Sequence, residues 1–324
     1  MMHRRQLAAA AAAALAAPAL ARAQGAGWPA ERPIEVIVPF PPGGGVDVMT
    51  RLILPFAAQH LPGARFFVLN RAGAGGQIGF EAIFNAAPDG YTLGSVAVPA
   101  INTFALERPV RYQPLGFTFI ANVVDDPNTI YVPASSPLRT LQDLVQAAQQ
   151  RPGQMSYGTT GVGSDDHILT LTLEGMARLQ PMTHVPFAGA APLLAQVLGG
   201  HIELGVGNVA EILAPMRDGR IRALGQAAAQ RWDAAPDLPT FREQGFDIVA
   251  GSSRGIVGPP GLPDAIRSRL EQSFQAVLAD PAFLREAERA SLPLSPLVGP
   301  DYRQMVEQTN HAVRALWERR PWSG

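Results

Sequence analysis

A loop rich in proline and glycine is the part of this sequence best suited to holding a small ligand. Residues 38–47 read Val-Pro-Phe-Pro-Pro-Gly-Gly-Gly-Val-Asp and join a strand-like run at 33–38 to an apolar-periodic segment at 46–61. Glycine lets the main chain approach a bound group closely, and the free N–H groups of a following helix favour an anion. We therefore predict ligand contacts here, although similar turns also occur in loops that bind nothing. The predicted contacts are Phe40, Pro41, Pro42, Gly43, Gly44, Gly45 and Asp47.

A second loop, at 159–167, has the same design. It reads Thr-Thr-Gly-Val-Gly-Ser-Asp-Asp-His and lies between a short predicted strand and a predicted helix. Two facing helix N-termini would form a divided anion site that is completed only on closure. The predicted contacts are Thr159, Thr160, Gly161, Gly163, Ser164 and His167. A cap is expected from Ser164 or, preferably, Asp165, while the acids at 165 and 166 fit an anion poorly and would cap, face outward or meet a ligand amine.

Further candidates come from outside the two loops. Arg254 could clamp a carboxylate with two parallel hydrogen bonds or form an interlobe salt bridge. Asn208, after a predicted strand, could contact a ligand or cap the next helix. Ser95 and Val96 are weaker cleft candidates, and Phe187, like Phe40, could supply an apolar wall or belong to the core.

The elements that must position these residues alternate between strand and helix. Strands are predicted at 34–38, 66–70, 91–98, 118–124, 129–132, 155–158, 182–185, 202–207, 223–226 and 248–257. Helices are predicted at 46–61, 77–86, 141–150, 165–179, 190–199, 209–218, 238–244, 264–279, 282–290 and 299–318, with a capping box at Thr140 and a kink or break at Pro55. This rhythm predicts an α/β protein with largely parallel sheets.

The extended segments 118–133 and 246–257 predict two lobes. If both segments cross between lobes, lobe 1 is discontinuous, comprising 28–125 plus 254–324, and lobe 2 is the inserted part, 126–253. Two crossings make a hinge, and a cleft between lobes is a common place for a ligand.

The first residues predict export. Arg4 and Arg5 precede an apolar run at 7–17, and Ala21-Arg22-Ala23 provides a cleavage site, so residues 1–23 are interpreted as an export signal peptide. We favour the Sec route over the twin-arginine route. The predicted location is the periplasm, with no membrane insertion.

Composition excludes several classes of function. The formal net charge is −1, and loss of the three arginines of the signal would leave −4, which disfavours nucleic acid as a partner. There is no cysteine and no lysine, so thiolate metal sites, P-loops and lysine Schiff bases are excluded. The scattered histidines predict no metal site, and we expect no cofactor and a monomer.

Taken together, the motifs resemble the Bug family of extracytoplasmic solute receptors, the substrate-binding proteins of tripartite tricarboxylate transporters. The resemblance rests on 38–47, Asn70-Arg-Ala-Gly-Ala-Gly-Gly-Gln-Ile-Gly79, Ala87-Pro-Asp-Gly-Tyr-Thr-Leu93 and Tyr157-Gly-Thr-Thr-Gly-Val-Gly-Ser164, and continues to Gly258-Pro-Pro-Gly-Leu-Pro263. It implies a type II periplasmic-binding-protein fold, with two α/β lobes joined by two crossing strands and a carboxylate held in the interlobe cleft between 39–47 and 159–167. The family usually has Asp-Asn where this chain has Gly207-Asn208.

The predicted function is capture of a small organic anion, a carboxylate, for delivery to membrane transporter subunits. Arg254 and the missing acid before Asn208 favour a dicarboxylate, tricarboxylate or aromatic acid over an amino acid. One alternative is a periplasmic ligand sensor for a signalling partner. Another is a serine hydrolase, because Gly251-Ser-Ser-Arg-Gly255 matches the nucleophile-elbow pattern. A nucleophile elbow requires a helix directly after the serine, and Ile256-Val-Gly-Pro-Pro260 cannot start one. We therefore predict that the protein is not an enzyme.

Overall fold

A computed structural model describes residues 27–322; the predicted signal peptide lies outside the described residues. The strands are β1 Ile34–Val38, β2 Phe66–Asn70, β3 Thr92–Val98, β4 Thr118–Pro133, β5 Ser156–Thr159, β6 Thr183–Pro186, β7 Leu204–Asn208, β8 Ile221–Gln226, β9 Gly251–Gly258 and β10 Leu294–Val298. The helices are α2 Gly45–His60, α3 Gln77–Phe84, α4 Ala100–Glu107, α5 Leu141–Gln150, α6 Asp165–Met176, α7 Ala190–Leu198, α8 Val209–Arg217, α9 Asp264–Leu278, α10 Pro281–Arg289 and α11 Pro300–Arg319, with short 3-10 turns η1 Ala74–Gly76 and η2 Arg242–Gln244.

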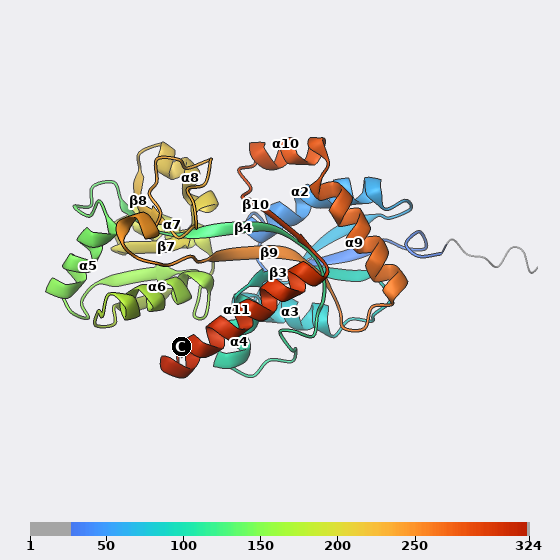
Figure 1. The fold of residues 1–324 in the computed structure, drawn as a ribbon, viewed down its shortest axis with the longest axis horizontal. Helices are drawn as coiled ribbons and strands as arrows, with labels where there is room; N and C mark the ends of the chain where they lie inside the picture. Colours follow the sequence, from blue (N-terminus) through green and yellow to red (C-terminus); the bar gives the residue numbers. More distant parts are fainter. Residues whose placement is uncertain (1–26, 323–324) are drawn as a thin grey trace, which may run out of the picture.

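Strand β4 runs through both halves of the molecule. Its first half pairs with β9 and β10, and its second half pairs with β7 and β8. The strand order is β2-β1-β3-β9-β4-β7-β5-β6, with β10 and β8 added on β4. Figure 1 shows β4 and β9 side by side between two groups of elements. We call the group with β1, β2, β3 and β10 lobe 1 and the group with β5, β6, β7 and β8 lobe 2. The exact boundaries expected at 125/126 and 253/254 stay a prediction.

Helices cover both faces of each half of the sheet. In lobe 1, α2, α9 and α10 pack on one face, around Met49 and Phe274, and α3, α4 and α11 pack on the other, around Phe104 and Tyr302. In lobe 2, one core lies beside α5 and α6 and the other beside α7 and α8. In lobe 1 the pairs β1–β2 and β1–β3 are parallel, and in lobe 2 the pairs β5–β6 and β5–β7 are parallel. In each lobe the loops that follow these strands therefore lie at the same edge of the sheet. That edge is where an open α/β sheet binds its ligand.

Several sequence expectations require correction. The break expected at Pro55 does not occur: α2 is continuous from Gly45 to His60. Pro55 is on the exposed side of the helix, where the carbonyl that loses its partner can face water. The two strands expected at 118–124 and 129–132 are one strand, β4. The helix expected at 238–244 is reduced to η2.

Lobe 1 also contacts lobe 2 away from the crossing strands. Figure 1 shows α11 passing beneath the crossing strands toward α6. There Val313 and Trp322 pack with Leu171, and Arg320 Nη2 lies 2.5 Å from Glu174 Oε2. These contacts join the C-terminal segment to helix α6 of lobe 2.

Candidate functional site

The first glycine loop ends in a helix whose N-terminus has no side-chain cap. Residues 41–44 are exposed, and Gly44 is in the N-cap position without a side-chain cap; the first amide of α2, that of Gly45, donates to the Glu211 carboxylate of lobe 2. Gly43 has φ +82°, a conformation that favours glycine. The amides of the first turn that follow Gly45 therefore remain able to bind an anion.

Asp47 stabilises this loop from inside. Its carboxylate accepts hydrogen bonds from the Gly43 N–H at 2.9 Å, from Arg51 Nε and from Asn70 Nδ2 at 2.8 Å. Burial raises the pKa of Asp47, but these hydrogen bonds outweigh burial and hold the pKa below its ordinary value. Asp47 thus holds the loop in shape, and its carboxylate oxygens accept hydrogen bonds from protein donors.

Three other lobe 1 candidates belong to the packing of the lobe. Ser95 is fully buried, and its hydroxyl lies 2.6 Å from that of Thr50. Val96 is fully buried in the core beside α4, and the half-buried Phe40 packs edge-on against Phe80 at 6.0 Å. The structure therefore does not bring Ser95 or Val96 to the interlobe surface.

In the second loop, most side-chain groups bond within the loop. Ser164 is the N-cap of α6, because its Oγ accepts from the His167 N–H at 3.2 Å, so the expectation that Asp165 would be the cap is wrong. Thr160 Oγ1 donates to Asp166 Oδ2 at 2.6 Å, and Thr159 Oγ1 lies 2.7 Å from His184 Nε2. These bonds hold the loop in shape, and the group that reaches lobe 1 is the backbone carbonyl of Gly163 rather than a hydroxyl.

His167 supports this loop from below. Its Nδ1 accepts from the Gly163 N–H at 3.1 Å, and its ring stacks on His184 at 4.1 Å. Burial lowers the pKa of His167 to about 3 and that of His184 to about 4, so both rings are neutral at physiological pH. Phe187 is half-buried and packs toward the core beside α7. None of these side chains is a charged ligand contact.

Direct contacts join the two lobes at the loops. Thr103 Oγ1, on α4 of lobe 1, donates to the Gly163 carbonyl of lobe 2 at 2.5 Å. Gly163 has φ +73°, and a Cβ atom added there would lie 2.8 Å from Glu107 Oε2 and 3.2 Å from the Phe104 ring, so glycine favours this close approach of α4. Thr103 was absent from the sequence prediction because α4 itself was missed.

Arg254 is the centre of an ion-pair network between the lobes. Its Nη1 lies 3.3 Å from Asp126 Oδ2, and its Nη2 lies 3.2 Å from Glu211 Oε1 and 3.0 Å from Asn208 Oδ1. The guanidinium also rests on the first turn of α2, since a Cβ atom added at Gly45 would lie 2.0 Å from Nη1. Arg254 is thus neutralised by acids of the protein, which corresponds to the interlobe salt bridge foreseen beside the clamp role.

Asn208 links the same network to the second loop. Its Nδ2 donates to the Asp126 carbonyl at 3.1 Å and to Asp165 Oδ2 at 2.9 Å. It stands at the N-cap of α8, but its side chain makes no capping hydrogen bond. Instead Asp126 Oδ1 accepts from the Ala210 N–H in the first turn of α8.

The acids in this region outnumber the cations. Burial raises the pKa of Asp126 to about 7, against the lowering effect of Arg254 and with a further increase from Glu211. Burial also raises the pKa of Glu211, again opposed by Arg254, and the pKa of Asp166 is raised by burial and by the neighbouring Asp165. Carboxylates are in excess here, because the single buried guanidinium of Arg254 is shared by several of them.

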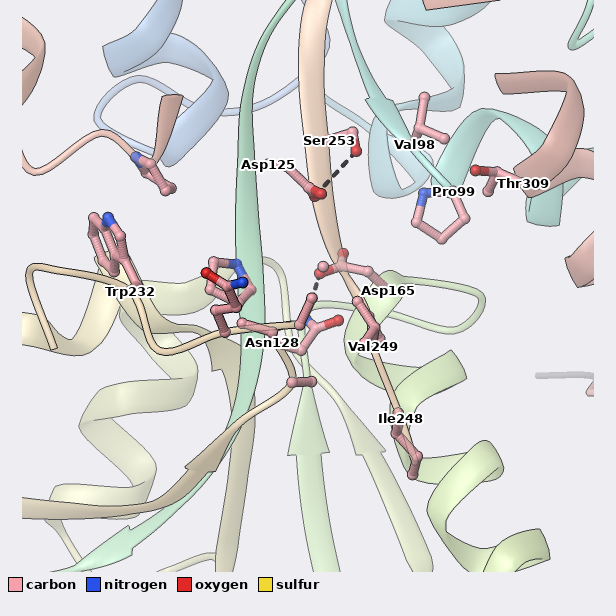
Figure 2. Close-up of a pocket in the computed structure, with 18 of the residues that line it drawn as sticks. Val98, Pro99, Asp125, Asn128, Asp165, Trp232, Ile248, Val249, Ser253 and Thr309 are labelled. Carbon is pink, nitrogen blue, oxygen red and sulfur yellow. Dashed lines mark hydrogen bonds between the residues drawn. The ribbon is translucent and has the colours of Figure 1, made fainter. Parts of the chain in front are cut away.

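A groove of about 1310 Å³ opens beside the crossing strands. Figure 2 shows Asp125, Asn128 and Asp165 at its centre, with Val98 and Pro99 of lobe 1 on one side. Ser253, the serine of the elbow-like pattern, donates to Asp125 Oδ1 at 3.1 Å. It lies within the continuous strand β9, not at a strand-to-helix turn, so the geometry of a nucleophile elbow is absent there.

Within residues 27–322, no group of three or more His, Asp or Glu side chains is arranged to hold a metal ion. Over the same residues, no helix is both long and apolar enough to cross a bilayer.

Comparisons with known proteins agree with this geometry. The family model described as the tripartite tricarboxylate transporter family receptor matches residues 56–319. Protein BugT of Bordetella pertussis is 32% identical over 274 residues, which is 83% of each chain. Another relative, encoded in the gbd 5' region of Cupriavidus necator, is 29% identical over 96% of this chain and 94% of its own length.

Solved structures agree as well. A Rhodopseudomonas palustris protein with adipate is 28% identical, with a TM-score of 0.81 over 90% of this chain and 97% of that one. MatC from the same organism, with bound malate, is 25% identical, with a TM-score of 0.78 over 88% of this chain and 98% of its own. The expected type II periplasmic-binding-protein fold is therefore confirmed.

Proposed function

The chain belongs to the tripartite tricarboxylate transporter receptor family, which includes the Bug proteins, and we propose that it captures a small organic acid between its lobes and delivers it to a membrane transporter. Proteins of this family are periplasmic substrate-binding receptors and not enzymes. The coarse function, a periplasmic solute-binding protein, follows from membership. The carboxylate, its position and its transporter are the proposal.

The observation that carries the proposal is the uncapped N-terminus of α2 opposite lobe 2. The exposed Gly43 and Gly44 leave the backbone accessible, and the N-cap position has no side-chain cap; only the first amide, that of Gly45, has a protein partner, the Glu211 carboxylate of lobe 2. A carboxylate suits these donors because both the N–H groups and the helix dipole favour negative charge. Relatives with adipate and with malate support the same ligand chemistry.

Closure of the lobes is the functional event. The Thr103–Gly163 hydrogen bond and the Arg254–Glu211 ion pair each join one lobe to the other, so both would form or break as the lobes move. A ligand held by backbone groups from both lobes binds the closed arrangement more tightly than the open one, and it therefore favours closure. The predicted contacts Gly43, Gly44 and Gly161 fit this role better than the hydroxyls and His167, which bond within the loop.

A thermal-shift screen tests the proposal. Protein refolded from denaturant, to remove co-purified ligand, is mixed with small carboxylic acids and with their neutral amides. An acid present at about 100 times its Kd stabilises the folded state by about 2.7 kcal/mol, whereas its amide should give no shift. Shifts with amides alone would rule out carboxylate capture, and a screen without any shift by an acid would also count against it.

Delivery to a transporter requires a cellular test. Cells that lack this protein should lose uptake of the acid that the screen identifies, and uptake should return with the intact gene. Normal uptake in the deletion strain, together with loss of a transcriptional response to the acid, would instead identify a sensor.

A further inference from the structure

An apolar cluster joins the two lobes on the side where α11 passes α6. Its buried members are Leu171 of α6, Val313 of α11 and Trp322, which are 6%, 5% and 3% exposed. The partly buried residues around them come from both lobes: Leu106, Leu316 and Trp317 from lobe 1, and Val162 and Ile168 from lobe 2. The cluster is separate from the cores of the two lobes, so its burial depends on the lobes lying together.

An ion pair accompanies this apolar contact. Arg320, directly after α11, donates to the Leu171 carbonyl at 3.3 Å and to Glu174 Oε2 at 2.5 Å. The Glu174 side chain is 1% exposed, and its Oε1 accepts from the Met182 N–H at 2.7 Å. A buried carboxylate is strongly disfavoured without a counter-charge. Separation of the lobes here would therefore leave Glu174 of lobe 2 without the arginine that lobe 1 supplies.

The same cluster holds the second glycine loop. Val162 packs on the cluster, and it lies between Gly161 and Gly163, two of the predicted solute contacts. The Gly163 carbonyl accepts from Thr103 of α4 at 2.5 Å. Figure 1 shows the end of α11 beside α4 and below α6. The last part of α11 and α4 therefore hold the loop at 159–167 against lobe 1.

We propose that residues 313–322 form a strap that holds lobe 2 and its glycine loop against lobe 1, and that this strap sets the affinity for the solute from outside the cleft. The inference rests on the proposed function for the role of the loop. Two crossing strands form a hinge, and a hinge alone leaves the lobes free to open. A contact that exists only in the closed arrangement raises the population of that arrangement before solute binds. The apparent affinity for a solute rises in proportion to that population.

The distance between the lobes tests the strap without any solute. Because the chain has no cysteine, spin labels are attached at Met176→Cys on α6 and Gln308→Cys on α11, two exposed positions in different lobes. Pulsed electron paramagnetic resonance then measures the distribution of distances between the labels. The labelled protein with an intact strap should give one short distance, and Trp322→Ala should shift most of the distribution to a longer one.

Two further variants separate the strap from a general loss of stability. Arg320→Met combined with Glu174→Gln removes the ion pair without leaving a buried charge, and it should also lengthen the distance. Trp28→Ala is the matched control, because Trp28 packs on the core of lobe 1, and it should leave the distance unchanged. Urea unfolding of each variant shows whether it is folded under the conditions of the distance measurement.

Malate and adipate, the acids in two related structures, serve as solute probes. If the closed population of Trp322→Ala is about one tenth of that of the intact protein, calorimetric titration should show about 10-fold weaker binding of each probe that the intact protein binds. A saturating concentration of that probe should return the short distance, because the solute then supplies the preference for closure that the strap has lost.

Each outcome separates the two proposals. Unchanged distances in both strap variants, or an equal shift in Trp28→Ala, would overturn the strap and leave the proposed function intact. A lengthened distance with unchanged affinity for a bound probe would overturn the control of affinity by the strap. A lengthened distance when neither acid binds the intact protein would support the strap as the contact that holds the lobes, and would count against these two acids as solutes.

Discussion

Replacement of Arg254 by methionine distinguishes an interlobe ion-pair centre from a ligand clamp. In the structure the guanidinium contacts Asp126, Glu211 and Asn208, and its side chain is 4% exposed. Methionine retains much of the apolar stem but leaves two largely buried carboxylates without a counter-charge. Removing one partner of a buried ion pair costs about 3 to 5 kcal/mol, so the free energy of unfolding of the ligand-free protein should fall by that amount at pH 8.

The cost should depend on pH in a definite direction. Burial raises the folded-state pKa of Asp126 to about 7, and Arg254 opposes that increase. An acid with a raised pKa stabilises the fold below its unfolded pKa, near 4, and this stabilisation is lost as the pH rises through about 7. Without Arg254 the pKa of Asp126 rises further, so Asp126 keeps its proton above pH 7 in the folded variant. The free energy of unfolding of the variant therefore continues to fall above pH 7, by about 1.4 kcal/mol per pH unit for each such proton, whereas that of the native protein stops falling. Burial also raises the pKa of Glu211 and of Asp166, so these two acids act in the same sense.

The assay is urea unfolding followed by circular dichroism at pH 5 and pH 8, without ligand. Arg303→Met is the matched control, because Arg303 forms an exposed i, i+4 pair with Glu307, and the change should cost less than about 0.5 kcal/mol. Combining Arg254→Met with Glu211→Gln should recover part of the loss, since the unpaired carboxylate is then removed. A cost below about 1 kcal/mol at both pH values, with loss of the ligand-induced shift, would refute the ion-pair centre and identify Arg254 as a ligand clamp.

Two smaller changes test the loops. Gly45→Ala should lower stability by about 1 to 3 kcal/mol, because the added Cβ would lie 2.0 Å from Arg254 Nη1. Gly44→Ala, whose Cβ would be 3.6 Å from the nearest atom, is the control for stability, and equal effects of the two changes in thermal melts would contradict the contact. Ser164→Ala should cost about 1 kcal/mol by removing the N-cap of α6, measured by urea unfolding, whereas Ser164→Asp should retain most of the stability; no loss in the alanine variant would show that the cap contributes little.

Local chemistry was readable in the sequence wherever neighbours along the chain supply the partners. The capping box at Thr140 forms as predicted, because Thr140 and Asp143 are only three residues apart. The glycine loop at 38–45 ends in α2 for the same reason. Helix α4 was missed because Pro99 and Ala100 supply no cap, and β10 was missed because Pro296 interrupts a short strand.

The sequence by itself therefore determined the alternation of strands and helices, the two glycine loops and the membership of a receptor family. Only the tertiary structure decided what the charged residues do. Arg254 and Glu211 are 43 residues apart, and Asn128 and Asp165 are 37 apart, yet each pair is in contact once β4 and β9 cross between the lobes. An isolated arginine suggests an anion site, whereas an arginine neutralised by buried acids does not, because the field at a site is the sum of all charges that folding brings there.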